Sequence, residues 1–188
     1  DKKREFILPS SPSMDILISS NLERLIYLST GCDAEANRKL MEQLNTQGSY
    51  EVTETMKEAM KDFTGGFATE AENAAEIKKV YEDTGYVIDT HTGVASAVYR
   101  AYAEKTGDKT PTVIASTASP YKFSHSVMEA IRGDEGSKDE FAIIDELCAV
   151  SGVKIPAAVE EIRNAEIRHK RESDVEDMEK TVAEILGL

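Results

Sequence analysis

The stretch from Pro111 to Phe123 constrains the fold more than any other part of this sequence. Residues 112–115 read TVIA, a short apolar run with β-branched side chains, which predicts a buried strand. Small polar residues follow, and Ser119 with Pro120 is typical of the N-cap and first position of a helix. A strand, a polar turn and a helix in this order indicate an α/β sheet, in which ligands bind beside the turns that follow the strands.

A second unit of the same kind lies upstream. Residues 86–88 predict another short strand, Asp89 to Gly93 form its polar exit, and an apolar helical face begins at Val94. Because the carboxyl ends of parallel strands meet at one edge of a sheet, the two polar turns are expected to line one crevice.

The polar residues of these turns allow two interpretations. The hydroxyls of Ser116, Thr117 and Ser119 either point into the crevice or only cap the helix and close the turn. His91 is either a structural hydrogen-bonding residue or an acid–base group. A triad of Ser116, His91 and Asp89 can be drawn, but the sequence lacks the spacing of a nucleophile elbow. Asp89 and His91 supply too few ligands for a metal, so no metal site is predicted.

Helices are predicted for most of the remaining chain. A strand at residues 6–8 precedes a helix over 13–28 that is apolar nearly all round and is therefore expected to be buried. A run of helices follows, then the two strand–turn–helix units, then a helical tail. The four segments are residues 1–32, 33–85, 86–132 and 133–188.

The composition excludes several classes of partner. The 188 residues have a formal net charge of −13 and no basic patch with aromatic residues, which argues against nucleic acid. Cys32 and Cys148 lack the spacing of metal ligands and favour a reducing compartment. The sequence has no long apolar run and no leader pattern, so we expect a cytoplasmic protein without a membrane partner.

Three long motifs resemble signature segments of threonine synthase. They read SPSMDILISSNLERL at 11–25, TGYVIDTHTGVA at 84–95 and STASPYKF at 116–123. The resemblance covers essentially the whole chain. It implies a pyridoxal 5'-phosphate enzyme with a tryptophan-synthase-β-like fold, which converts O-phospho-L-homoserine and water to L-threonine and phosphate. The expected fold class is thus α/β, as the C-terminal part of that fold, mostly helical with a few short parallel strands.

The resemblance also assigns roles to individual residues. It places Thr117, with Ser116 beside it, at the pyridine nitrogen of the cofactor, where a neutral hydroxyl does not keep the nitrogen protonated as a carboxylate would. Arg24 either makes a bidentate contact with the substrate phosphate or pairs with a carboxylate of the fold. The candidates for substrate binding are Ser13, Asn21, Arg24, Asp89, His91, Thr92 and Lys122.

Upstream segments of the family have no match in this sequence. They are the Schiff-base lysine in a Ser-Phe-Lys-Asp-type motif, a hydroxyl-rich Ser-Gly-Asp-Thr-Gly-type segment and a Gly/Asn loop for the cofactor phosphate. Lys122 belongs to a downstream motif and is not the Schiff-base position. The resemblance therefore implies a C-terminal portion of threonine synthase, inactive without the missing N-terminal half. The alternative is a non-catalytic, stand-alone α/β module that acts by protein association.

Overall fold

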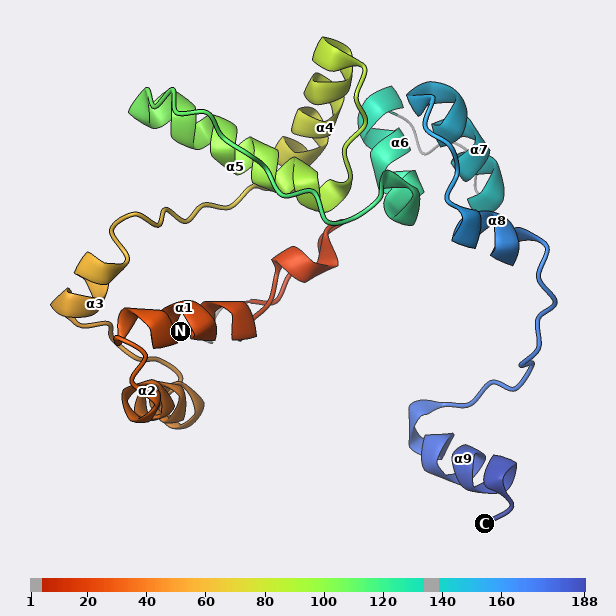
Figure 1. The fold of residues 1–188 in the computed structure, drawn as a ribbon. Helices are drawn as coiled ribbons and strands as arrows, with labels where there is room; N and C mark the ends of the chain where they lie inside the picture. The colour runs from red at the N-terminus through yellow and green to blue at the C-terminus, as the bar shows by residue number, and fades with distance from the viewer. Residues whose placement is uncertain (1–4, 134–138) are drawn as a thin grey trace. The chain divides into compact units, whose positions relative to one another are not determined.

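The computed structural model describes residues 5–133 and 139–188 (Figure 1). The regular structure in these residues is helical, and no strand occurs among them. The chain divides into two compact units, of which the first ends at Lys154 and the second is Ile155–Leu188. Part of the predicted tail, residues 134–138, lies outside the described residues. No helix in the described part of the chain is long and apolar enough to cross a membrane.

Side-chain caps explain where the first helices begin. Asp33 accepts hydrogen bonds from Glu35 N and Ala36 N, and Thr69 forms a capping box with Glu72. These caps confirm the predicted helical run between 33 and 85. The helices of this part are α1 (Ser20–Ser29), α2 (Ala34–Gln47), α3 (Glu54–Ala59), α4 (Glu70–Thr84) and α5 (Thr90–Thr106).

The downstream half is also helical. Ser119 caps the turn that begins with Pro120, as predicted, but this first turn is a 3-10 helix and the α-helix begins only at Ser124. The elements are η2 (Pro120–Phe123), α6 (Ser124–Arg132), α7 (Glu140–Ser151), α8 (Ala157–Arg163), η3 (Val175–Asp177) and α9 (Met178–Leu186).

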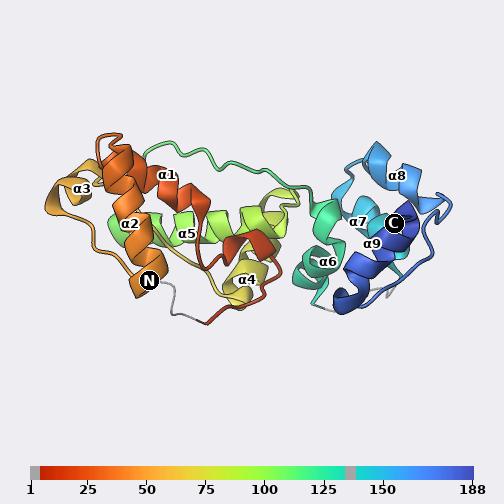
Figure 2. The same cartoon turned by 90° about the horizontal axis from the view of Figure 1, so that it is seen from below.

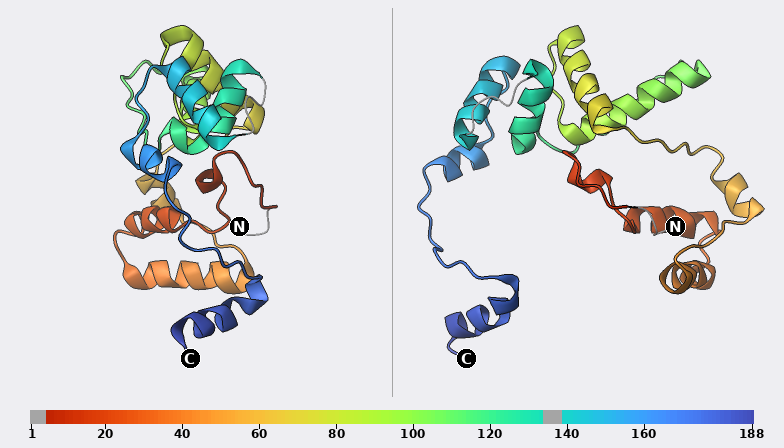
Figure 3. Two further views of the ribbon diagram at one scale, coloured as in Figure 1. Left: turned by 90° about the vertical axis from the view of Figure 1, so that its right-hand side faces the viewer. Right: turned by 180° about the vertical axis from the view of Figure 1, so that it is seen from behind.

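Helix α4 packs against two other helices of the first unit. It contacts α5 and α6, and α7 contacts α6 (Figure 2). Helix α1 contacts α2 and α3 (Figure 3). Burial of apolar side chains is the main favourable contribution to such packing. The buried residues in α4, α6 and α7 include Ile77, Val127, Met128, Ile143 and Leu147, and those in α1, α2 and α3 are Ile26, Leu44 and Met56.

An ion pair joins α4 to α5. Glu76, which is 5% exposed, accepts hydrogen bonds from Arg100 Nε at 2.7 Å and Nη2 at 2.8 Å, and from Ser96 Oγ at 2.7 Å. The hydrogen bond from Arg100 lowers the pKa of Glu76, and burial of the carboxyl opposes this shift. The planar guanidinium therefore holds a buried carboxylate in its charged form.

The predicted strands at 6–8, 86–88 and 112–115 are wrong for this structure. All three segments lack regular secondary structure, and Val113 is 95% exposed. A strand is stable only when a neighbouring strand pairs its backbone N–H and C=O groups, and residues 5–133 and 139–188 contain no such neighbour. Val87 and Ile88 are nevertheless buried, so that segment packs its apolar side chains without forming a sheet.

The predicted buried helix over 13–28 is also corrected. A 3-10 turn, η1 (Pro12–Met14), is followed by irregular chain, and the helix begins at Ser20 after the N-cap Ser19. The side chain of Asp15 accepts a hydrogen bond from Ile7 N at 2.6 Å, a local bond that competes with helix formation. Leu22 and Leu28 are 50% and 60% exposed, so the packing of α1 against α2 and α3 leaves part of its apolar surface open.

Candidate functional site

Asp89 begins α5 and lies at the centre of the candidate site. Its Oδ1 accepts hydrogen bonds from His91 N at 2.8 Å and from Thr92 N at 3.3 Å, and the residue is 1% exposed. A carboxylate at this position bonds the unpaired N–H groups of the first turn and is favoured by the helix dipole. The helix therefore begins at Thr90, earlier than the predicted start at Val94.

The side chain of Thr92 joins the two predicted turns. Its Oγ1 is hydrogen-bonded to Asp89 Oδ2 and lies 2.9 Å from Ser116 Oγ. Thr92 is buried, whereas Ser116 is exposed. The expected meeting of the two turns is thus confirmed, although no strand leads into either of them.

His91 contacts Asp89 and the aromatic ring of Phe123. Its Nδ1 lies 3.4 Å from Asp89 Oδ1, and its ring centroid lies 4.8 Å from that of Phe123. Lys122 Nζ lies 5.5 Å from the centroid of the same Phe123 ring, within the range of a cation–π contact. The Ser116 hydroxyl bonds to Thr92 rather than to the imidazole, so the triad of Ser116, His91 and Asp89 is not assembled in this structure.

The other predicted site residues lie in exposed positions. Thr117 is exposed next to Ser116, and Ser13 is exposed in η1. On α1, Arg24 Nη2 donates a hydrogen bond to Asn21 Oδ1. In the described part of the chain, this pair has no hydrogen bond to the cluster around Asp89. The guanidinium thus bonds an amide here, and not the carboxylate considered from the sequence.

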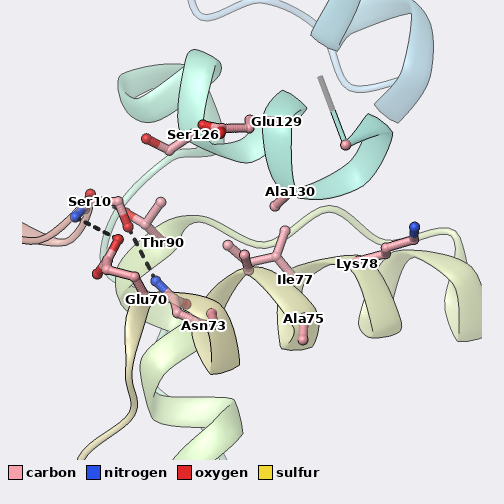
Figure 4. Close-up of a pocket in the computed structure, with 13 residues that line it drawn as sticks. Ser10, Glu70, Asn73, Ala75, Ile77, Lys78, Thr90, Ser126, Glu129 and Ala130 are labelled. Atoms are coloured by element: carbon pink, nitrogen blue, oxygen red, sulfur yellow. Dashed lines mark hydrogen bonds between the residues drawn. The ribbon is translucent and has the colours of Figure 1, made fainter. Parts of the chain in front are cut away.

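The sequence did not predict the role of Ser10, which lies against α4 and α5. Its carbonyl oxygen accepts a hydrogen bond from Thr90 Oγ1 at 2.9 Å, its hydroxyl accepts one from Asn73 Nδ2 at 3.4 Å, and its N donates to Glu70 Oε2 at 3.1 Å. Figure 4 shows these residues at the edge of an open pocket of about 440 Å³. Ser126 of α6 also lines this pocket. No local sequence signal could have identified Ser10, because its partners lie 60 to 80 positions away.

Replacing Thr90 by Val is expected to release this segment from α5. Thr90 is fully buried and Ser10 partly buried, so water replaces the lost hydrogen bond of the Ser10 carbonyl only in part, at a cost of about 1 kcal/mol in the free energy of unfolding. Amide hydrogen exchange should become faster around Ser10. The matched control is Thr106→Val on the same helix, where the exposed hydroxyl donates to Tyr102 O at 2.8 Å and water can take its place. Equal effects of the two variants would contradict the assignment.

The sequence of this chain also matches a model of a known protein family. The family model described as "Threonine synthase, C-terminal" matches residues 92–186, just over half of the chain. The chain belongs to the threonine synthase family. The resemblance of its three sequence motifs is thereby confirmed at the level of the family.

Curated relatives and solved structures of the threonine synthase family agree with this result. The chain is 38% identical to "Threonine synthase" of Saccharomyces cerevisiae, over 65% of this chain and 27% of the relative. It is 35% identical to human "Threonine synthase-like 1", over 70% of this chain and 17% of the relative. The chain therefore spans about a quarter or less of the length of these relatives.

Two solved structures are similar to this chain. The crystal structure of the yeast threonine synthase aligns with a TM-score of 0.73 and 27% identity, over 98% of this chain and 38% of that chain. The structure of threonine synthase from Brucella melitensis with bound pyridoxal phosphate aligns with a TM-score of 0.62 and 36% identity, over 80% and 31%. The helices described above are thus similar to part of a threonine synthase fold.

Proposed function

We propose that this chain forms the ring-nitrogen side of the pyridoxal 5'-phosphate site in a threonine synthase. The observation that supports the proposal most directly is the hydrogen-bonded set of Asp89, Thr92 and Ser116. Two of these three residues lie within the segment matched by the family model. The overall reaction converts O-phospho-L-homoserine and water to L-threonine and phosphate.

The donor set fits one edge of the cofactor. Ser116 and Thr117 are consecutive exposed residues with hydroxyl side chains, and Ser116 Oγ is hydrogen-bonded to the buried Thr92. A hydroxyl can form a hydrogen bond with the nitrogen of a pyridine ring. It cannot form the covalent bond to the cofactor that a lysine forms. When bound, the cofactor withdraws electrons from the amino-acid substrate.

Other residues of the chain would act on the substrate. Thr92 joins Asp89 to Ser116, and His91 contacts Asp89. His91 and Lys122 both contact the ring of Phe123. We expect these side chains to orient the substrate or the attacking water. Ser13, Asn21 and Arg24 remain candidates for the substrate phosphate, which a guanidinium binds well once it leaves its amide partner.

The lysine that binds the cofactor covalently is proposed to lie outside these 188 residues. Borohydride reduction fixes pyridoxal phosphate on the lysine that holds it. We expect no specific lysine to be modified in the 188-residue chain alone. In the protein isolated from source cells with an antibody against this chain, one lysine outside residues 1–188 should be modified, as mapped by peptide mass spectrometry.

The other outcomes are equally informative. Modification of a unique lysine within the chain, such as Lys122, would mean that the cofactor site is complete here and would contradict the proposed division of roles. Absence of the cofactor from the protein isolated from cells would contradict the enzymatic function and favour a non-catalytic module.

A further inference from the structure

We propose that residues 112–115 are a docking surface for the portion of a threonine synthase that carries the cofactor lysine. A strand of that portion pairs with the backbone of residues 112–115, so that the two portions share one sheet. The proposal rests on the proposed function, because it uses the placement of that lysine outside residues 1–188.

The backbone of this segment has no partner in the described structure. Residues 112–115 lie between α5 and η2 and lack regular secondary structure (Figure 1). No other described residue forms a hydrogen bond with the backbone of residues 113–115. Unpaired N–H and C=O groups in a run of β-branched residues are a template with which another strand can pair.

Both ends of the segment are held against α5. Before the segment, Asp108 Oδ2 accepts a hydrogen bond from Tyr102 Oη at 3.0 Å, and after it, Ser116 Oγ lies 2.9 Å from Thr92 Oγ1. Tyr102 and Thr92 both belong to α5. These contacts restrict the conformations of the segment, so less conformational entropy is lost when a strand pairs with it.

The side chains of the segment differ in how they are covered. Ile114 is half-buried and lines a pocket of about 460 Å³ with Ser96 and Tyr99 of α5, whereas Val113 is 95% exposed and Ala115 is exposed as well. Successive side chains of a strand point to opposite faces. The segment thus has the pattern of a strand with a helix on one face and no cover on the other.

The cofactor identifies the partner of this segment. The proposed function places Ser116, which directly follows residues 112–115, at the ring nitrogen, and places the lysine outside residues 1–188. Both residues contact the same small molecule, so the lysine-bearing portion must reach the end of residues 112–115. Ligands of α/β sheets bind outside the carboxyl ends of the strands, and a parallel strand from that portion would end at the same edge.

Hydrogen exchange tests the pairing in the protein isolated from source cells with an antibody against this chain. The amides of residues 113–115 should exchange at least about 100-fold more slowly than unprotected amides, because a paired strand opens only together with its neighbours. The control is segment 166–171, which is irregular, exposed and mostly charged, and which should exchange rapidly. Rapid exchange at 113–115 in a protein that holds the cofactor on a lysine outside residues 1–188 would overturn the inference and leave the proposed function intact.

Photo-cross-linking identifies the occupant. In the complete protein, replacing Val113 by the photoreactive residue p-benzoylphenylalanine should give a cross-linked peptide from outside residues 1–188 of the same polypeptide. The matched control is the same replacement at Phe67, which is 87% exposed in irregular chain before α4 and should not link to that peptide. A cross-link to residues within 1–188, to a second copy of this chain or to a different protein would overturn the inference. A cofactor lysine within residues 1–188 would contradict the proposed function itself.

Discussion

Replacing Gly93 by Ala is expected to destabilise the protein, although Ala is normally the better helix residue. A Cβ at this position would overlap Asn73 Oδ1 and would lie 2.9 Å from Ile77 Cγ1. Asn73 and Ile77 are each 1% exposed, so neither side chain can move into open space. Such overpacking costs about 1–3 kcal/mol, and the helix propensity of Ala recovers at most about 1 kcal/mol. We expect a net loss of about 1–2 kcal/mol in the free energy of unfolding by urea.

The contact with Asn73 can be isolated by a double-mutant cycle. Asn73 Oδ1 is buried and has no hydrogen-bond partner among the described residues, whereas Nδ2 of the same side chain donates to Ser10 Oγ, so the cost of Asn73→Ala itself is measured separately. In an Asn73→Ala background, Gly93→Ala should be more favourable by about 1–2 kcal/mol than in the native protein. Ala101→Gly on the exposed side of α5 measures the difference in helix propensity between Ala and Gly in the same helix. Additive effects of the two substitutions would show that α4 and α5 do not meet closely at Gly93.

The helices could be predicted from the sequence because their start signals are local. Asp33 and the pair Thr69 and Glu72 lie within three residues of the N–H groups that they bond, so tertiary contacts are not needed to recognise them. The predicted start of α5 lies too far along the chain, because Asp89 was assigned to a polar turn after a strand rather than to the N-cap of the helix. The same side chain can have either role, and only the backbone conformation distinguishes them.

The strands could not be predicted correctly, because a strand depends on a partner. The run at 112–115 has the side chains of a strand, yet no segment of the described residues pairs with its backbone. The apolar helix expected over 13–28 failed for a related reason. Its hydrophobic residues indicate burial, but the sequence of one helix does not show how many other helices pack against it.

The candidate site was predictable in part. The sequence indicated that the turns at 89–93 and 116–119 meet, and Thr92 does contact Ser116. The contact of Ser10 with α4 and α5 and the ion pair between Glu76 and Arg100 were not predicted. Both depend on how α4 packs against α5, and an acidic residue next to Ile77 on a helix is otherwise typical of a solvated position.

The ion pair between α4 and α5 should be the most sensitive charged contact of the described structure. Arg100→Met keeps most of the aliphatic stem but leaves the carboxylate of Glu76 buried with Ser96 as its remaining hydrogen-bond donor. Breaking a fully buried pair costs about 3–5 kcal/mol. Because the Arg100 side chain is 41% exposed, water can reach part of the gap, and we expect a loss of about 2 kcal/mol in the free energy of unfolding at neutral pH.

The pH dependence of this loss has a definite sign. In the native protein the pKa of Glu76 lies below its ordinary value of about 4.3, so the stability from the pair is complete above that value and disappears as the pH falls through the lowered pKa. In Arg100→Met the largest cause that lowers the pKa of Glu76 is gone, and burial is opposed only by the Ser96 hydrogen bond and the charge of Lys79. The pKa of Glu76 is therefore higher than in the native protein, and the folded state takes up a proton at a higher pH. The stability difference between the two proteins should therefore shrink as the pH is lowered from 7 to 4.

A surface pair provides the control for this experiment. Arg38 forms ion pairs with Glu35 and Glu42 on the exposed face of α2, where water screens the charges, so Arg38→Met should have little effect on stability. Glu76→Gln keeps the size of the buried side chain and removes the charge, so its stability should depend less on pH than that of the native protein between pH 3 and about 5. Urea unfolding measured at several pH values tests all three variants. If Arg100→Met had the same small, pH-independent effect as Arg38→Met, the buried carboxylate would not need its guanidinium partner, and α4 and α5 would be held together by their apolar contacts alone.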